Sequence, residues 1–113
     1  MIRFFVQIEY DGTNYHGFQK QPKTKKTIQY EVERALSDVA NHKVVTVCSG
    51  RTDAGVHAMN QFVHFDTKSK RKIESWVKGV NSYLPEDISV KNFFKVNPDM
   101  HARFSANSRS YVY

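Results

Sequence analysis

The sequence has 113 residues, of which 40% are hydrophobic and 13% aromatic, and its formal net charge is +6 at neutral pH. This length allows one domain with a single hydrophobic core, and the apolar content excludes a disordered or low-complexity chain. The apolar runs are too short to span a bilayer, and the first residues lack the pattern of a secretory signal. Because the one cysteine, Cys48, provides no disulfide framework, we expect a cytoplasmic location without membrane association.

The first part of the chain predicts a strand followed by a helix. Apolar side chains occupy every second position of residues 2–10, which is typical of a strand. A turn cluster at residues 11–14 and a lysine-rich loop then lead to Thr27, a residue type that favours a helix N-cap. Apolar residues recur at helical spacing over residues 28–39, which predicts the first helix.

The second part predicts two short strands, a second helix and a last strand. β-Branched runs at 44–48 and 61–65 indicate the two strands. A helical apolar stripe over residues 73–84 ends before a proline and contains Trp76, which we assign to the core. With a last strand at 88–96, the order predicts an α+β, ferredoxin-like (βαββαβ) fold, in which a four-stranded antiparallel sheet carries both helices on one face.

The positive charge is concentrated in two runs. The first comprises Lys20, Lys23, Lys25 and Lys26, and the second comprises Lys68, Lys70, Arg71 and Lys72. Such runs are either solvated loop residues or contacts to an acidic polymer, for which nucleic acid is the simplest candidate. The sequence leaves both interpretations open.

The segment between the two short strands holds the densest group of candidate functional residues. It reads SGRTDAGVHA over residues 49–58, so that two glycines bracket Arg51 and Asp53. Glycine permits unusual backbone angles and a close approach of the backbone to a ligand. On spacing alone, a structural salt bridge between Arg51 and Asp53 is an alternative to a functional site.

Residues 50–58, GRTDAGVHA, resemble the catalytic loop of the tRNA pseudouridine synthase A family. Three further segments are similar to that family in the same order along the chain. They are YDGTNYHGFQKQ at 10–21, NSYLPEDI at 81–88 and FSANSRSYVY at 104–113. The family often has Trp where this sequence has Phe18. The resemblance therefore extends over nearly the whole chain.

The resemblance implies a two-domain enzyme in which each half is a ferredoxin-like unit. Residues 1–104 match the N-terminal unit and residues 105–113 match the start of a second one, so we expect this chain to be a piece of a longer protein. The family relationship implies a homodimer that isomerises uridine to pseudouridine at positions 38 to 40 of the tRNA anticodon arm. It also implies that no metal ion or organic cofactor takes part.

The resemblance also implies roles for individual residues. Asp53 is implied to be the catalytic carboxylate, acting as nucleophile, electrostatic stabiliser or base beside C1′ or C6 of the uridine. Arg51 is implied to keep Asp53 ionised and to fill the gap left by the extruded base or grip a phosphate. Tyr111 is implied to stack on the uracil. The other candidates for substrate binding are Tyr15, Gln19, Gln21 and His57, each with a purely structural role in its loop as the alternative.

A binding module that recognises RNA through its sheet face, without catalysis, is the alternative function. Residues 62–65, FVHF, match the end of the RNP1 signature of RNA-recognition domains, whereas residues 58–61 lack its basic, glycine-containing beginning. The histidines and Cys48 show none of the ligand spacings typical of metal sites. The spacing therefore predicts no metal site, and the absence of a cofactor is implied by the resemblance.

Overall fold

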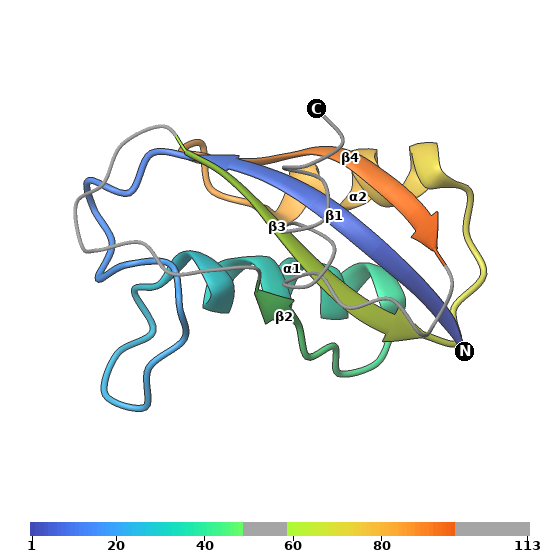
Figure 1. The fold of residues 1–113 in the computed structure, drawn as a ribbon, viewed down its shortest axis with the longest axis horizontal. Helices are drawn as coiled ribbons and strands as arrows, with labels where there is room; N and C mark the ends of the chain where they lie inside the picture. The colour runs from blue at the N-terminus through green and yellow to red at the C-terminus, as the bar shows by residue number, and fades with distance from the viewer. Residues whose placement is uncertain (49–58, 97–113) are drawn as a thin grey trace, which may run out of the picture.

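In the residues that the computed structural model describes, 1–48 and 59–96, six elements follow one another in the predicted order. They are β1 (Ile2–Tyr10), α1 (Ile28–Ala40), β2 (Val47–Cys48), β3 (Met59–Thr67), α2 (Ile73–Tyr83) and β4 (Ile88–Val96). Figure 1 shows the strands as one twisted layer with both helices on the same side of it. The predicted α+β, ferredoxin-like architecture is confirmed.

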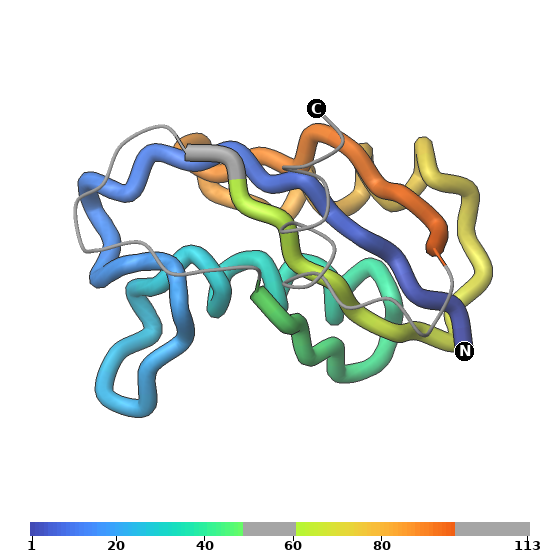
Figure 2. Tube along the Cα trace, viewed as in Figure 1, coloured from blue at the N-terminus to red at the C-terminus, as the bar shows by residue number. Residues whose placement is uncertain are grey.

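The strand β1 lies inside the sheet, whose order is β2-β3-β1-β4 with antiparallel neighbours throughout. It pairs with β3 along its whole length, from Ile2 opposite Thr67 to Tyr10 opposite Met59. Tyr10 is also paired with Ile88, the first residue of β4, and Figure 2 shows β1 running between these two strands. The end of β1 and the starts of β3 and β4 therefore meet at one edge of the molecule.

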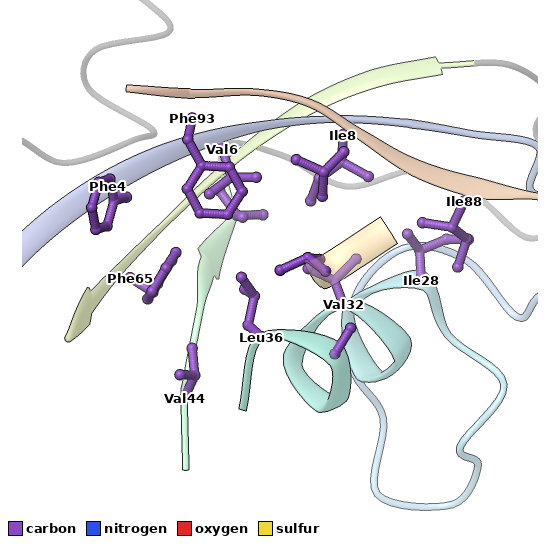
Figure 3. Close-up of a cluster of buried hydrophobic side chains, with 14 of the residues drawn as sticks. Phe4, Val6, Ile8, Ile28, Val32, Leu36, Val44, Phe65, Ile88 and Phe93 are labelled. Atoms are coloured by element: carbon purple, nitrogen blue, oxygen red, sulfur yellow. The ribbon is translucent and has the colours of Figure 1, made fainter. Parts of the chain in front are cut away.

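The hydrophobic core lies between the sheet and the two helices (Figure 3). Its buried members include Phe4, Val6, Ile8 and Tyr10 of β1, Ile28, Val32 and Leu36 of α1, and Phe65, Val80, Ile88 and Phe93 of the remaining elements. Trp76 of α2 is fully buried, and its ring stacks on that of Phe93 with centroids 5.6 Å apart. The assignment of Trp76 to the core is confirmed.

The strand β2 is shorter than the run at 44–48 that predicted it. The backbone N–H of Val44 donates to Ser37 Oγ at 2.9 Å, and that of Thr46 donates to Glu33 Oε2 at 2.7 Å. Both acceptors lie on α1. The residues before β2 are thus held by helix side chains, so the strand begins later than its β-branched composition suggests.

The strand β3 is longer than the run at 61–65 that predicted it, because β1 provides a partner along nine residues. Pairing across a sheet extends a strand into polar residues that carry no local strand pattern. The helix α2 ends at Tyr83, two residues before Pro85, since a proline disfavours the helical conformation of the residue that precedes it. The strand at 88–96 has the predicted bounds.

The predicted start of a second domain at residues 105–113 lies outside the described residues. Within the part of the chain that is described, neither helix is long and apolar enough to cross a membrane.

Candidate functional site

Three connections meet where β1 ends and where β3 and β4 begin. The loop at 11–27 leaves the sheet at Tyr10, which lies opposite both Met59 and Ile88. The segment at 49–58 joins the sheet at Met59, and the connection from α2 joins it at Ile88. The candidate site is this end of the sheet, formed by the end of β1 and the starts of β3 and β4. We call it the loop edge.

Four of the predicted site residues lie outside the described part of the chain, and their roles stay predictions. They are Arg51, Asp53, His57 and Tyr111. The described residues on either side of the 49–58 segment are fixed in the sheet, because Cys48 lies opposite Val63 and Met59 lies opposite Tyr10.

The first loop is anchored by backbone hydrogen bonds to the start of α1. The carbonyl groups of Gly17 and Phe18 accept from the N–H groups of Ile28 and Gln29 at 3.3 and 2.8 Å, which satisfies donors that a helix start leaves open. Gly17 has a φ of 92°, a conformation that other residues rarely adopt. Thr27 caps the helix as predicted, since its side chain accepts from the N–H of Tyr30. The loop therefore has a defined path.

Tyr15 fastens this loop to the start of β4. Its hydroxyl donates to Asp87 Oδ1 at 2.7 Å, and the carbonyl of Asp87 accepts from the N–H of Asp11 at 2.9 Å. Burial of the Tyr15 side chain and the adjacent Asp87 carboxylate raise the pKa of the Tyr15 hydroxyl above its usual range. The structure thus gives Tyr15 a structural task, while its contact with a substrate stays a prediction.

Gln19 and Gln21, the other two candidates in this loop, are both exposed. The amide of Gln21 donates to the carbonyl of His16 at 2.6 Å, and its backbone forms a bridge with Thr24. Gln21 therefore helps to close a short hairpin over residues 20–26, which we call the basic hairpin.

The basic hairpin contains the first lysine run and lies beside the start of α1 (Figure 1). It borders a hollow of about 580 Å³ lined by Lys20, Gln21, Pro22, Lys23, Thr24, Lys25 and Tyr30. Lys25 Nζ lies 5.9 Å from the centre of the Tyr30 ring, within the range of a cation–π contact. The hollow is thus both basic and partly aromatic.

The second basic run lies at the opposite end of the strands. It follows Thr67, which pairs with Ile2 at the start of β1. Arg71 Nε donates to the carbonyl of Val39 in the last turn of α1 at 2.8 Å, so part of this run caps a helix. The first run, in contrast, lies in the loop between β1 and α1.

Sequence reasoning missed a polar cluster between α1 and the residues before β2, formed by the buried Gln29, Glu33 and Thr46 together with the exposed Lys20. The side chains of Gln29, Glu33 and Thr46 belong to residues that are at most 7% exposed. The available signal was the pair of polar residues four positions apart, next to the apolar stripe of α1. Their partners, Lys20 before the helix and Thr46 after it, can be recognised only from the fold.

Among the described residues, no three His, Cys, Asp or Glu side chains are grouped so that they would hold a metal ion.

The described residues combine a ferredoxin-like sheet with a basic hairpin, and clustered lysines of this kind are typical of nucleic-acid-binding proteins. The family model described as tRNA pseudouridine synthase matches residues 6–105. The chain belongs to this family, which confirms the resemblance seen in its motifs.

Individual relatives are similar along the whole of this chain. It is 53% identical to tRNA pseudouridine synthase A of Vibrio campbellii over 112 residues, which cover 99% of this chain and 42% of that protein. It is 51% identical to tRNA pseudouridine synthase A of Colwellia psychrerythraea, with 99% and 43% covered. The protein of the same name from Buchnera aphidicola (subsp. Acyrthosiphon pisum) is 54% identical, with 97% and 41% covered. This chain therefore spans about two-fifths of the length of these relatives.

Proposed function

We propose that this chain is the N-terminal part of an isomerase that converts uridine to pseudouridine at positions 38 to 40 of the tRNA anticodon arm. The observation that carries the proposal is the family match over residues 6–105, since this range contains the GRTDAGVHA segment. The relatives named tRNA pseudouridine synthase A support the same assignment.

The reaction explains the types of residue in the 49–58 segment. The C1′–N1 bond of the uridine breaks, the uracil turns over, and a C1′–C5 bond forms while C5 loses a proton and N1 gains one. A carboxylate beside C1′ or C6 serves this sequence as nucleophile, as electrostatic stabiliser or as base. Asp53 supplies that carboxylate.

The uridine must leave its stack before it reacts, at a cost of about a few kcal/mol. Arg51 offsets this cost by filling the vacated space or by binding a phosphate, and its fixed charge keeps Asp53 ionised. Tyr111 stacks on the extruded uracil. His57, Gln19 and Gln21 complete the contacts with the RNA, and Tyr15 holds the loop that carries the two glutamines.

The basic hairpin binds the tRNA backbone. Lys23 and Lys25 line the hollow beside the basic hairpin and Lys26 follows them in the hairpin, and lysines in such a position neutralise phosphates and release counterions. Lys20 is different, because its ammonium group is paired with Glu33 at 2.7 Å. We therefore assign the phosphate contacts to the other three lysines.

The active assembly is larger than this chain. Residues 1–104 form its N-terminal domain, residues 105–113 begin a second domain, and the whole enzyme is a cytoplasmic homodimer that needs no cofactor. The length of the relatives, about two and a half times that of this chain, supports this division. We call this chain, continued by its C-terminal part, the full-length protein.

The alternative, a module that only binds RNA through the outer face of its sheet, is less well supported. Phe5 and His64 lie on that face, opposite each other in the sheet, and their rings stack with centroids 5.7 Å apart. Each is only 4% exposed, so neither ring offers a free platform for a base. Phe94 on β4 is 41% exposed. Phe62 on the same face is partly buried, so Phe94 is the one exposed ring among the described residues of this face, fewer than the two or three that such modules use to stack bases.

Release of tritium from tRNA labelled at C5 of uridine tests the proposed function. We expect the full-length protein to release tritium from tRNA with uridine at positions 38 to 40, and not from the same tRNA with cytidine there. Equal release from both tRNAs, or none from either, would contradict the proposal.

A further inference from the structure

Glu33 of α1 connects two other segments of the chain, the basic hairpin and the residues before β2. Its Oε1 accepts from Lys20 Nζ of the basic hairpin at 2.7 Å. Its Oε2 accepts from both the backbone N–H and the hydroxyl of Thr46, at 2.7 and 2.9 Å. The Glu33 side chain is only 10% exposed, so these bonds replace nearly all of its contact with water.

Gln29, one helical turn before Glu33, makes the same two connections. Its Oε1 accepts from the backbone N–H of Lys20 at 2.7 Å, and its Nε2 donates to the carbonyl and the hydroxyl of Thr46 at 3.1 and 3.0 Å. Thr46 thus has its N–H, its carbonyl and its hydroxyl all bonded to α1. Both the main chain and the side chain of Thr46 are therefore held by the helix.

Stability alone does not account for this cluster. The helix α1 is already fixed by an apolar stripe whose members Ile28, Val32 and Leu36 are fully buried. A buried ion pair contributes little net stability, because the loss of hydration offsets its attraction, and apolar replacements are often as stable. What the cluster provides is a defined geometry between Lys20, α1 and Thr46.

Thr46 lies directly before β2, the strand that leads into the proposed catalytic segment. Val47 and Cys48 form β2, and the next residues along the chain are 49–58. Asp53 lies in that segment. The contacts of Thr46 with α1 and the pairing of Cys48 opposite Val63 therefore together set the position from which the chain enters the segment that carries the proposed catalytic carboxylate.

We propose that Glu33, assisted by Gln29, is a positioning residue for the isomerisation, acting through Thr46 on the entry to residues 49–58 and through Lys20 on the basic hairpin. This inference rests on the proposed function, with Asp53 as its catalytic carboxylate. A misplacement of about 1 Å in a catalytic group costs about a hundredfold in rate. The cluster therefore affects the chemical step more than the binding of tRNA.

The test compares variants of Glu33 with a control on the same helix. In the full-length protein, Glu33→Ala should lower the single-turnover rate of tritium release at saturating protein by about tenfold or more, and leave the tRNA Kd within about twofold. Glu33→Gln should recover part of the rate, because its amide oxygen still accepts from Thr46. The control is Glu31→Ala, which removes an exposed pair with Arg34 (2.6 Å) and should keep the rate of the parent protein.

A second pair of variants keeps the test decisive if Glu33→Ala does not fold. Thr46→Val removes the hydroxyl while keeping the shape of the side chain, and Thr46→Ser retains the hydroxyl. We expect Thr46→Val to be slower than the parent and Thr46→Ser to approach it, with all rates measured where circular dichroism shows each variant folded.

The outcomes separate the positioning role from the proposed function. A parent-like rate in folded Glu33→Ala or, where that variant does not fold, in Thr46→Val, or losses that appear only as weaker tRNA binding, would overturn the positioning role and leave the proposed function standing. A parent protein that releases no tritium would overturn both.

Discussion

Tyr15 and Gln21 use their polar atoms to hold the first loop, whereas Gln19 is left exposed at its surface. The motif that contains all three residues does not distinguish these tasks, since the partner of Tyr15 is Asp87, 72 positions further along the chain. At the residue scale, a shared motif therefore combines side chains that build the site with side chains available to a ligand.

The hydrogen bond from Tyr15 to Asp87 makes stability depend on pH in the alkaline range. At neutral pH, we expect Tyr15→Phe to lower the free energy of unfolding by about 1–2 kcal/mol. The pKa of Tyr15 is raised in the folded state, so the unfolded chain ionises first, near pH 10. The contribution of this hydroxyl is present below about pH 10 and is lost as the pH rises further.

Urea unfolding of the parent and of Tyr15→Phe from neutral pH to about pH 11 measures this effect. The difference between the two proteins should shrink above about pH 10, and a constant difference would contradict the assignment. Tyr83→Phe is the control at neutral pH, and it should cost little because Tyr83 is 49% exposed.

A second prediction at the residue scale concerns Trp76. Its indole Nε1 is buried and has no hydrogen-bond partner among the described residues. Trp76→Ala should lower the free energy of unfolding by about 3–5 kcal/mol through the cavity that it leaves. Trp76→Phe should cost clearly less, since it keeps an aromatic ring beside Phe4 and Phe93 and removes the unpaired donor. Equal losses in the two variants, measured by chemical denaturation, would argue against this description of the core.

At the scale of elements, the sequence predicts the order of strands and helices, because buried apolar residues recur at every second position in a strand and at helical spacing in a helix. It does not predict where β2 begins, since Glu33 binds Thr46 across 13 positions and that contact exists only in the fold. Nor does it predict how closely the helices approach. An added Cβ on Gly79 of α2 would lie 3.1 Å from a methyl group of Val39 of α1. The apolar pattern of the two helices does not predict this close contact.

The two basic runs should differ in their effect on tRNA binding. Replacing Lys23, Lys25 and Lys26 by Gln in the full-length protein should weaken binding and flatten its dependence on salt, by about 0.7–0.9 log units in slope for each phosphate that is no longer neutralised. The matched control replaces Lys68, Lys70 and Lys72, which carry the same charge at the opposite end of the strands. A slope that falls equally in both variants would show that overall charge, rather than the basic hairpin, is responsible.

At the scale of the whole molecule, the described residues form a closed core, whereas part of the candidate site lies outside them. The sequence motifs predict Asp53, Arg51, His57 and Tyr111 as site residues, and all four lie outside the described part. The fold supplies two features that the motifs lack, namely the sheet edge at which the 49–58 segment joins and the polar cluster that holds its entry.

We expect the 113-residue chain to fold by itself and to be catalytically inactive. Its helices and strands bury a core without further residues, but a catalytic site must hold its substrate to within about 0.5 Å, which requires the second half of the protein. Tritium release should be absent from this chain alone and should appear after mixing with a separately produced C-terminal half. Activity of the chain alone would show that one domain suffices.

The most direct measurement of the proposed catalytic role is tritium release by the full-length protein with Asp53→Asn. This change keeps the size of the side chain and removes its charge, so the reaction should stop while tRNA still binds and the protein stays folded. Turnover within about tenfold of the parent would remove Asp53 from its role and contradict the proposed mechanism.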